Sequence, residues 1–566
     1  MADVISTSGE PELTVRAVVV GALLGAVFAA GNVYVGLKTG LADNATVTAA
    51  ILGFAACRTF GRTKYTTLEN NITQSISSSA ASMPAAMGFL GSFPALTLLG
   101  RDYPGGVLLL WGGAIGLLGI AFALPLAKRF LSDDALPFPD AIATAEVIRA
   151  MHRSGKSAFA KTRALVIAAL ASGAFAWFRD GKPSVLGAAY YLPLAISGVP
   201  AATLSLGIVY SPVLVSIGAL MGRRTALGLF AGGVLGYVLL APALVENHLV
   251  AEATGAALRA WLVWPGASLM IAAAVTSLAR DWRLLARSAR DMRALGAPGV
   301  ASAFVAPGVL ALATMVIGSF AFGLRLPILA ASMAISVLTA VLIARSIGET
   351  ATMPLGSVGR LTQLALAPAT GAAVVSVLAA SIPAGSGGQT GQTLETLKAG
   401  KMLGASTSRQ ITAQLVGALV GAPCAAGAYV MLTRAYSLGS AELPAPTASP
   451  FKVMAELIGQ GTAALPPHAD TASLVACALG VLLTFLERTK AARYVPSPLA
   501  MGLAFVLGAA PSFTMAAGAL LLAIVARARP AWADEYGSSV AAGGLVGEAL
   551  TGIVVATLLV THVLGE

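Results

Sequence analysis

Charged side chains are scarce in this sequence. Of its 566 residues only 11% are Asp, Glu, Lys or Arg, while 57% are hydrophobic. A soluble globular domain usually carries about 25% charged residues, and the deficit here extends along the whole chain. The mean hydropathy of +0.82 agrees with this distribution. The composition therefore argues against a soluble domain and predicts an all-α polytopic membrane protein.

Cysteine and histidine are also rare, with three and four residues. The cysteines lie in or beside apolar runs without the spacing of a metal site, and no two histidines form a ligand pair, so we expect packing thiols and no bound metal. The sequence has no Gly-x-x-x-x-Gly-Lys-[Ser/Thr] phosphate loop and no His-Glu-x-x-His or Gly-x-Ser-x-Gly motif. These absences disfavour an ATPase and an intramembrane enzyme. We expect an ion gradient to supply the energy, with no cofactor.

The chain is rich in long apolar runs. Since about 20 residues of helix span the hydrocarbon core, the clear runs together with shorter, polar or interrupted ones predict roughly 14 to 17 membrane segments. The clear runs cover residues 15–37, 42–60, 105–126, 164–178, 226–244, 260–278, 305–322, 328–344, 411–432, 474–485, 515–526 and 540–564. The number of helices, and whether that number is odd or even, stays open.

The net charge of +11 could indicate a nucleic-acid partner, but the positions of the basic residues argue against one. They gather in short loops between apolar runs, as at Arg280, Arg283, Arg287, Arg290 and Arg293. Short cytoplasmic loops of membrane proteins are enriched in Lys and Arg. We therefore predict a basic cytoplasmic linker at 281–299 in a multi-pass protein of the cytoplasmic membrane.

Three short motifs recur in the same order in both halves of the chain. Arg58-x-x-Gly-x-Thr recurs from Arg345, Thr144-x-Glu-x-Ile recurs as Thr393-x-Glu-x-Leu, and Ser211-Pro recurs as Ser497-Pro. Internal repeats are the usual construction of secondary transporters. The predicted organisation is a polar tail at 1–13, a first transmembrane repeat at 14–280, the linker at 281–299, and a second repeat at 300–566. The repeats could be parallel or inverted.

Two segments interrupt the apolar pattern, one in each half. Pro137-Phe-Pro139 precedes the first copy of the Thr-x-Glu motif, and a glycine-rich stretch at 385–391 precedes the second. Two prolines this close cannot lie inside a continuous helix, and irregular backbone at membrane depth needs protein or a watery cavity around it. We expect broken or re-entrant helices here, at Pro137, Pro139, Gly385, Gly387 and Gly388. Paired broken segments are typical of a transporter's binding site.

Acidic and amide side chains inside the apolar runs are the candidates for binding and coupling. An acid at the centre of a membrane helix costs about 2.5–3.5 kcal/mol, so each one needs a reason. The polar stretch 68–79 cannot face lipid and must line protein or a cavity. The residues predicted to bind substrate are Asn32, Tyr34, Glu69, Asn70, Gln74, Gln389, Gln392 and Glu395. Those predicted to take part in proton coupling are Glu69, Glu146, Glu395 and Glu548.

Several of these residues have a structural alternative. Tyr34 could be an interfacial anchor, a common role for aromatic residues at helix ends. Glu146 and Glu395 could lie at aqueous helix ends, each paired with the basic residue three positions on. Glu548 could make a structural hydrogen bond. Which glutamate carries the proton stays open.

Five stretches resemble the oligopeptide transporter family, in that family's order and nearly end to end. They are 32–40 (Asn-Val-Tyr-Val-Gly-Leu-Lys-Thr-Gly), 69–75 (Glu-Asn-Asn-Ile-Thr-Gln-Ser), 136–146 (Leu-Pro-Phe-Pro-Asp through Glu146), 385–405 (Gly-Ser-Gly-Gly-Gln-Thr-Gly-Gln, Leu-Lys and Gly-Ala) and 494–498 (Tyr-Val-Pro-Ser-Pro). The resemblance implies about sixteen helices in two related halves. It is strongest to the prokaryotic and yellow-stripe-like branch, although Asp140 stands where that pattern has Glu.

The resemblance implies a proton-coupled secondary transporter that imports small peptides or siderophore-type metal chelates. A channel conducting through the glycine-rich break is the alternative from another class, and an intramembrane enzyme is disfavoured. The expected partners are the substrate and the lipid bilayer, without nucleic acid. The exact substrate and self-association into a homo-oligomer stay open.

Overall fold

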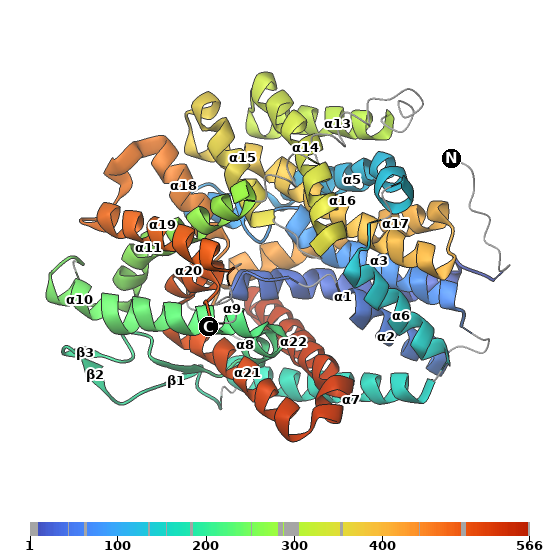
Figure 1. Cartoon of the computed structure of the whole chain (residues 1–566), viewed down its shortest axis with the longest axis horizontal. Coiled ribbons are helices and arrows are strands. Elements are labelled where there is room, and N and C mark those ends of the chain that lie inside the picture. The colour runs from blue at the N-terminus through green and yellow to red at the C-terminus, as the bar shows by residue number, and fades with distance from the viewer. Residues whose placement is uncertain are drawn as a thin grey trace. The chain divides into compact units, whose positions relative to one another are not determined.

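The computed structural model describes residues 10–42, 45–60, 65–133, 136–153, 155–181, 185–250, 252–280, 287, 305–350, 355–440, 442–487, 489 and 494–563. Helices dominate these residues, which confirms the predicted all-α polytopic fold (Figure 1). Eleven of the helices described are long and apolar enough to cross a membrane. Apart from Arg287, the predicted linker at 281–299 lies outside the described residues.

The chain forms two compact units, each of which combines segments from both halves of the sequence. Unit 1 comprises Met1–Gly36, Leu41–Arg163 and Asp281–Thr433, and unit 2 comprises Leu37–Gly40, Ala164–Arg280 and Arg434–Glu566. Helix α1 therefore passes from unit 1 into unit 2 near its last turn.

Unit 1 contains nine complete α-helices among its described residues, together with most of α1, most of α17 and the start of α7. They are α1 (Val15–Thr39), α2 (Thr46–Phe60), α3 (Thr67–Ala86), α4 (Ser92–Leu98), α5 (Gly105–Lys128) with a π-turn η1 (Arg129–Asp133), α6 (Pro139–Arg153), α7 (Gly155–Asp180), α13 (Val305–Phe322), α14 (Leu326–Thr350), α15 (Leu355–Thr370), α16 (Ala373–Leu403) and α17 (Thr407–Ala435).

Unit 2 holds the rest of α7, two small two-stranded sheets and the remaining helices. They are β1 (Ala189–Tyr191), β2 (Ala195–Ile196), β3 (Val199–Pro200), β4 (Gly207–Val209), α8 (Pro212–Leu220), α9 (Arg223–Gly233), η2 (Val234–Leu240), α10 (Ala241–Glu246), α11 (Gly255–Arg280), α18 (Ala448–Gln460), η4 (Gly461–Ala464), α19 (Ala469–Leu486), α20 (Pro498–Leu507), α21 (Ala509–Ala528) and α22 (Pro530–Val560). Strand β1 pairs antiparallel with β4, and β2 with β3.

The glycine-rich segment does not break its helix, which corrects the prediction for Gly385, Gly387 and Gly388. Helix α16 runs without interruption through Pro383 and all three glycines. A Cβ on Gly385 would lie 2.1 Å from the carbonyl oxygen of Ala86, and one on Gly387 would lie 2.6 Å from Ile343 Cδ1. The glycines therefore allow close helix packing, as small residues do between membrane helices. The channel alternative was based on irregular backbone in this segment, and the continuous helix removes that basis.

This packing makes a stability prediction with a matched control. Gly385→Ala should lower the stability by about 1–3 kcal/mol, because a side chain inserted into a packed interior forces its neighbours to move. Gly427 on α17 is exposed, and nothing lies within 4 Å of the position that a Cβ would occupy there, so Gly427→Ala should instead raise the stability by up to about 1 kcal/mol. Thermal unfolding of both variants in detergent measures this difference, and equal shifts would contradict it.

The proline pair behaves as predicted in the first half. Pro139 is the first residue of α6, where its missing N–H is not needed. Phe138 before it has a φ of +49° and a fully buried side chain, and its backbone N–H donates to the carbonyl oxygen of Gly348 at 2.9 Å. A new short helix therefore does begin after Pro137.

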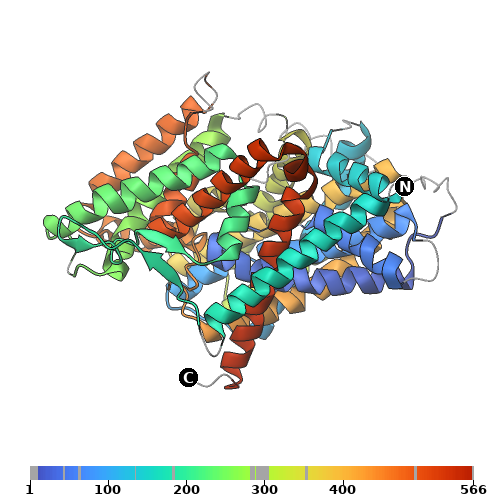
Figure 2. The same cartoon turned by 90° about the horizontal axis from the view of Figure 1, so that it is seen from below.

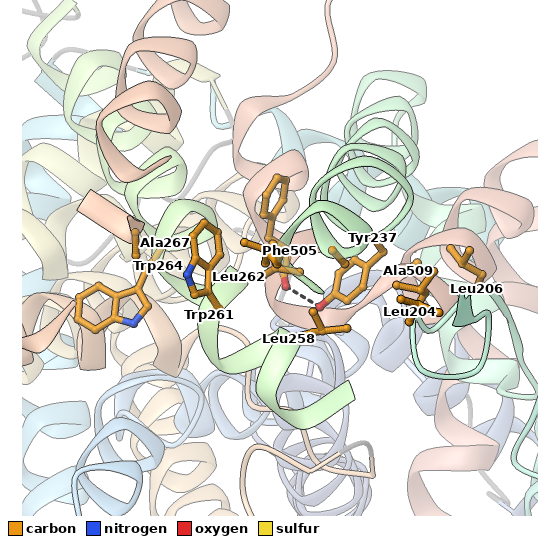
Figure 3. Packing of buried hydrophobic residues seen from close by; sticks show 14 of the residues in the cluster. Leu204, Leu206, Tyr237, Leu258, Trp261, Leu262, Trp264, Ala267, Phe505 and Ala509 are labelled. Atoms are coloured by element: carbon orange, nitrogen blue, oxygen red, sulfur yellow. Dashed lines mark hydrogen bonds between the residues drawn. The ribbon is translucent and has the colours of Figure 1, made fainter. Parts of the chain in front are cut away.

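Unit 2 has its own apolar core, built from the loop after β3 and from η2, α10, α11 and α20. Figure 3 shows the buried tyrosine of this core, Tyr237, whose hydroxyl donates to the carbonyl oxygen of Phe505 at 2.9 Å. Trp261 and Trp264 lie on α11 beside Leu258 and Leu262. The Tyr237 hydroxyl is thereby satisfied inside an apolar cluster, as buried phenols require.

Small residues bring α7 and α22 together within unit 2, where Figure 2 shows the two long helices crossing. A Cβ on Gly543 would lie 2.2 Å from the carbonyl oxygen of Leu165, and one on Gly547 would lie 2.0 Å from that of Ala169. Ser172, farther along α7, donates to the carbonyl oxygen of Gly544 at 2.5 Å. Such close backbone approach is typical of helix pairs in lipid.

Two helix starts in unit 2 are equivalent in sequence and in structure. Ser211 caps α8 by accepting from the backbone N–H of Leu214, and Ser497 caps α20 by accepting from that of Ala500. A proline follows each serine, and the two serines are 286 residues apart. The next helices, α9 and α21, each begin after a glycine, again 286 residues apart.

The packing of these helices is reciprocal. A Cβ on Gly232 of α9 would lie 2.2 Å from the carbonyl oxygen of Met501 on α20. A Cβ on Gly518 of α21 would lie 2.2 Å from the carbonyl oxygen of Val215 on α8. Gly232 corresponds to Gly518, and Val215 to Met501, at the same separation of 286 residues. In one contact the first half of the chain supplies the glycine and the second half the carbonyl oxygen, and in the other contact these roles are exchanged. The same exchange occurs at a two-fold symmetric interface.

Candidate functional site

Helix α3 carries a polar side chain at most positions and is nevertheless inside unit 1. Thr66 caps it by accepting from the backbone N–H of Glu69, whose side chain accepts in return from the backbone N–H of Thr66. This capping box starts the helix. From Leu68 to Met83 all its residues are buried, including Asn70, Asn71 and Gln74, each with no exposed surface. Protein therefore surrounds this helix, as the polar stretch predicts.

The carboxylate of Glu69 is held by three neighbours. Oε1 accepts from the Thr14 hydroxyl at 2.6 Å and from Arg16 Nε at 2.7 Å, and Oε2 accepts from Arg16 Nη2 at 2.6 Å. With the backbone N–H of Thr66 at 2.9 Å, both oxygens are occupied. A bidentate arginine pair stabilises the charged carboxylate. Glu69 therefore joins α1 to the first turn of α3 and must lose an ion pair to take up a proton.

The glutamines of α16 reach α3 across the interior of unit 1. Ser82 donates to Gln389 Oε1 at 2.7 Å, and Gln389 Nε2 donates to the Ser79 hydroxyl at 3.3 Å. Gln392 Nε2 contacts the Ser78 hydroxyl at 2.5 Å. The two stretches selected from the sequence are therefore brought together, although more than 300 residues separate them.

Buried amides next to these contacts lack partners. Both polar side-chain atoms of Asn71 and of Gln74 have no hydrogen bond within the described structure, and the same holds for Gln392 Oε1. Positions 71, 74 and 78 share one face of a helix, and Ser78 on that face contacts Gln392. An unsatisfied buried amide costs about 1–3 kcal/mol. A polar ligand or ordered water at this face of α3 would recover that energy.

Asn71 was absent from the residues selected by sequence, although it lies within the polar stretch. The signal that could have found it is its spacing, since it precedes Gln74 by three residues and so shares its face. Asn70, which was selected, has a different environment, because its Nδ2 lies 3.5 Å from His152 Nε2 on α6.

Asn32 and Tyr34 lie on α1 inside unit 1. Asn32 Nδ2 donates to the carbonyl oxygen of Ala81 at 2.8 Å and so joins α1 to α3. Tyr34 is only 4% exposed. These positions favour a buried role for both residues over that of an interfacial anchor.

The glutamates predicted for proton coupling have different environments. Glu395 is buried on α16, three residues beyond Gln392, whereas Glu146 on α6 is exposed. Glu548 belongs to α22 in unit 2 and has no exposed surface. The predicted proton-coupling residues are therefore divided between the two units, and only Glu146 is exposed.

Glu548 is the centre of a charged network in unit 2. Its Oε1 lies 2.8 Å from Lys38 Nζ and 2.9 Å from Arg179 Nη2. The Ser211 hydroxyl donates to both oxygens, and the backbone N–H of Val213 in the first turn of α8 donates to Oε2 at 2.7 Å. Two cations and a helix N-terminus stabilise the ionised carboxylate. This geometry favours a fixed counter-ion.

Comparisons with known proteins agree with this arrangement. The profile of the family "OPT oligopeptide transporter protein" matches residues 12–559. A Haemophilus influenzae protein named as an oligopeptide transporter is 24% identical, over 94% of this chain and 93% of its own. A Saccharomyces cerevisiae protein with the same description is 23% identical, over 89% and 90% of the two chains.

One plant protein is similar over nearly the same length. An Oryza sativa subsp. japonica protein named as a metal-nicotianamine transporter is 23% identical, over 95% of this chain and 89% of its own. The matches cover nearly the whole polytopic fold and include the polar helices α3 and α16. The chain is therefore a membrane transporter, not an enzyme, and it belongs to the oligopeptide transporter family.

Proposed function

We propose that this chain imports small peptides or peptide-like metal chelates across the cytoplasmic membrane, by symport with protons. The observation that carries the proposal is a pair of fully buried amides, Asn71 and Gln74, on the face of α3 that also bears Ser78. Neither amide has a hydrogen-bond partner among the described residues. A primary amide offers both a donor and an acceptor, which matches a peptide group. The names of the relatives, oligopeptide and metal-nicotianamine transporters, support this substrate class.

Glu395 is the residue we propose for the proton. Glu69 accepts from Arg16 and Glu548 from Arg179, so each of these two carboxylates would have to give up an ion pair to take up a proton. Glu146 is exposed, where a carboxyl group is not isolated from water. Glu395 is buried within one turn of Gln392 on α16, so a proton on it can respond to substrate at the α3 face.

We also propose that the chain contains an internal repeat, with halves at 14–280 and 300–566. The paired Ser-Pro helix starts and the reciprocal glycine contacts of α8, α9, α20 and α21 support it. Unit 1 likewise combines the first parts of both halves, and unit 2 the second parts. Repeats of this kind are typical of secondary transporters.

Uptake into liposomes tests the proposed site. Under an inward proton gradient, the wild type should accumulate trialanine or iron(III)–nicotianamine saturably, and a protonophore should abolish accumulation. Replacing both Asn71 and Gln74 by alanine should raise the KM at least about tenfold, because each amide contributes roughly 1 kcal/mol as a hydrogen-bonding partner of the substrate.

The matched control is Asn247→Ala, which removes an exposed amide at the end of α10. Its KM should equal that of the wild type. Uptake that persists in full after addition of the protonophore would reject proton coupling. An unchanged KM in the Asn71, Gln74 double variant would reject the α3 face as the substrate site.

A further inference from the structure

An arginine outside the site described above is buried and has no counter-ion among the residues that the structure describes. Arg360 lies on α15 and is 8% exposed. Its Nε is enclosed and has no hydrogen-bond partner, and no acidic side chain in the part of the chain that the structure describes forms an ion pair with it. In contrast, the buried Arg345 on α14 is paired with Glu349 at 2.7 Å.

An unpaired guanidinium in this position is costly. Removing a single charge from water costs several kcal/mol, even after relaxation of the protein. Arginine cannot avoid this cost by losing its proton, because it stays charged in proteins. A buried arginine therefore needs an anion, and among the described residues the protein does not supply one.

The side chain of Arg360 folds back toward the beginning of its helix. Its Nη2 lies 2.7 Å from the position that a Cβ on Gly356 would occupy. Gly356 is the second residue of α15, so the guanidinium approaches the end where the backbone N–H groups have no partner within the helix and the helix dipole is positive. Glycine at position 356 is what leaves room for it. The two positive features together favour an oxyanion.

The pairing of α15 with α16 indicates how far Arg360 lies from the proposed substrate site. Helices α15 and α16 are consecutive, and Gln363 Nε2 donates to the Ser376 hydroxyl near the corner between them at 3.2 Å. Arg360 is one turn farther from that corner. In an antiparallel pair it lies alongside the turn of α16 that begins near Ala379. The guanidinium itself lies one turn farther along, beside Gly356. At about 1.5 Å per residue, Gln389 is then about 9 Å away from it along the axis, a distance spanned by about three extended residues.

We propose that Arg360 binds a carboxylate of the transported substrate, either the C-terminal carboxylate of a peptide or a carboxylate of a metal chelator. This inference rests on the proposed function. A bidentate arginine pair would hold one end of the substrate, while the amides of α3 and α16 contact its peptide groups. A phosphate group of an anionic lipid has related chemistry and is distinguished below.

The transport test compares trialanine with trialanine amide, which lacks the carboxylate. The wild type should prefer the free acid at least about tenfold in kcat/KM, because a buried cation loses a charge-assisted bond to the amide. Arg360→Gln should reduce this preference below about twofold, and Arg360→Lys should restore part of it. The control Arg101→Gln, at an exposed cation of unit 1, should keep the wild-type preference. A preference unchanged in Arg360→Gln would overturn the inference while leaving the transport proposal intact.

A binding test separates this inference from the proposed function, because it needs no transport. In nanodiscs of phosphatidylcholine, sodium acetate should raise the thermal midpoint of the wild type relative to sodium chloride at equal ionic strength. Arg360→Gln should lose this difference and melt no lower than the wild type, since an unpaired buried charge has been removed. If Arg360→Gln melts at a lower temperature than the wild type, and acetate does not stabilise the wild type, then Arg360 has a structural role and the inference is overturned. If nanodiscs of phosphatidylglycerol stabilise the wild type and acetate does not, the site binds lipid phosphate. That result would also overturn the inference.

Discussion

Glu395→Gln is expected to abolish proton-driven accumulation of substrate while exchange of substrate across the membrane continues. Glutamine has the shape of a protonated glutamate but cannot release a proton. A carrier fixed in that state can still exchange internal for external substrate, but it gains nothing from the gradient. In liposomes loaded with trialanine, counterflow should stay within about threefold of the wild type, a change of less than 1 kcal/mol. Accumulation under an inward proton gradient should fall to the level seen with a protonophore.

The control is Glu146→Gln, which makes the same substitution at an exposed position on α6. It should accumulate substrate as the wild type does. Normal accumulation by Glu395→Gln would exclude Glu395 as the proton carrier. If Glu69→Gln alone lost coupling while retaining its fold, the carrier would be Glu69 and the ion pair with Arg16 would have to open during transport.

Glu548→Gln is expected to lower the stability of the protein by about 3–5 kcal/mol, the usual cost of removing one partner from a buried ion pair. The amide cannot balance Lys38 and Arg179, both of which lie within 3 Å of the carboxylate. Of these two cations, Arg179 also pairs with Asp180, so Lys38 is the cation chosen for removal in the test below. Unfolding in a denaturing detergent titration measures the change.

A double variant tests this explanation. Removing the cation as well, in Lys38→Met with Glu548→Gln, should recover at least about 1.5 kcal/mol relative to Glu548→Gln alone, because contacting charges are not additive. Glu487→Gln is the control, since Glu487 and Arg224 form an ion pair with side chains 28% and 37% exposed. It should cost less than about 1 kcal/mol. Equal losses in the two glutamine variants would show that the buried network is not stabilising.

The partners of the candidate site residues could not be predicted from the sequence. The alternation of polar and apolar residues selects Glu69 and Gln389, because a polar residue in an apolar chain stands out wherever it occurs. Their partners, Arg16 and Ser82, lie 53 and 307 residues away. Glu548 finds Lys38 at a separation of 510 residues. Such pairs depend on how the helices pack, which local pattern does not contain.

Arg360 illustrates the same limit. In the sequence it is one basic residue in a short, partly polar helix, and no neighbouring residue distinguishes it. Only its burial, the lack of a counter-ion in the part of the chain that the structure describes, and the space beside Gly356 make it a candidate anion site. Each of these properties belongs to the packed structure.

The sequence by itself determined that the protein is helical and membrane-embedded, and where its polar interior would be found. Composition and periodicity suffice for these properties, because lipid accepts apolar helices and excludes polar ones that are not covered by protein. The tertiary structure alone decided the role of the glycines in α16. The same residue can break a helix or allow a close approach, and only the backbone of Ala86, 2.1 Å from a Cβ on Gly385, distinguishes the two.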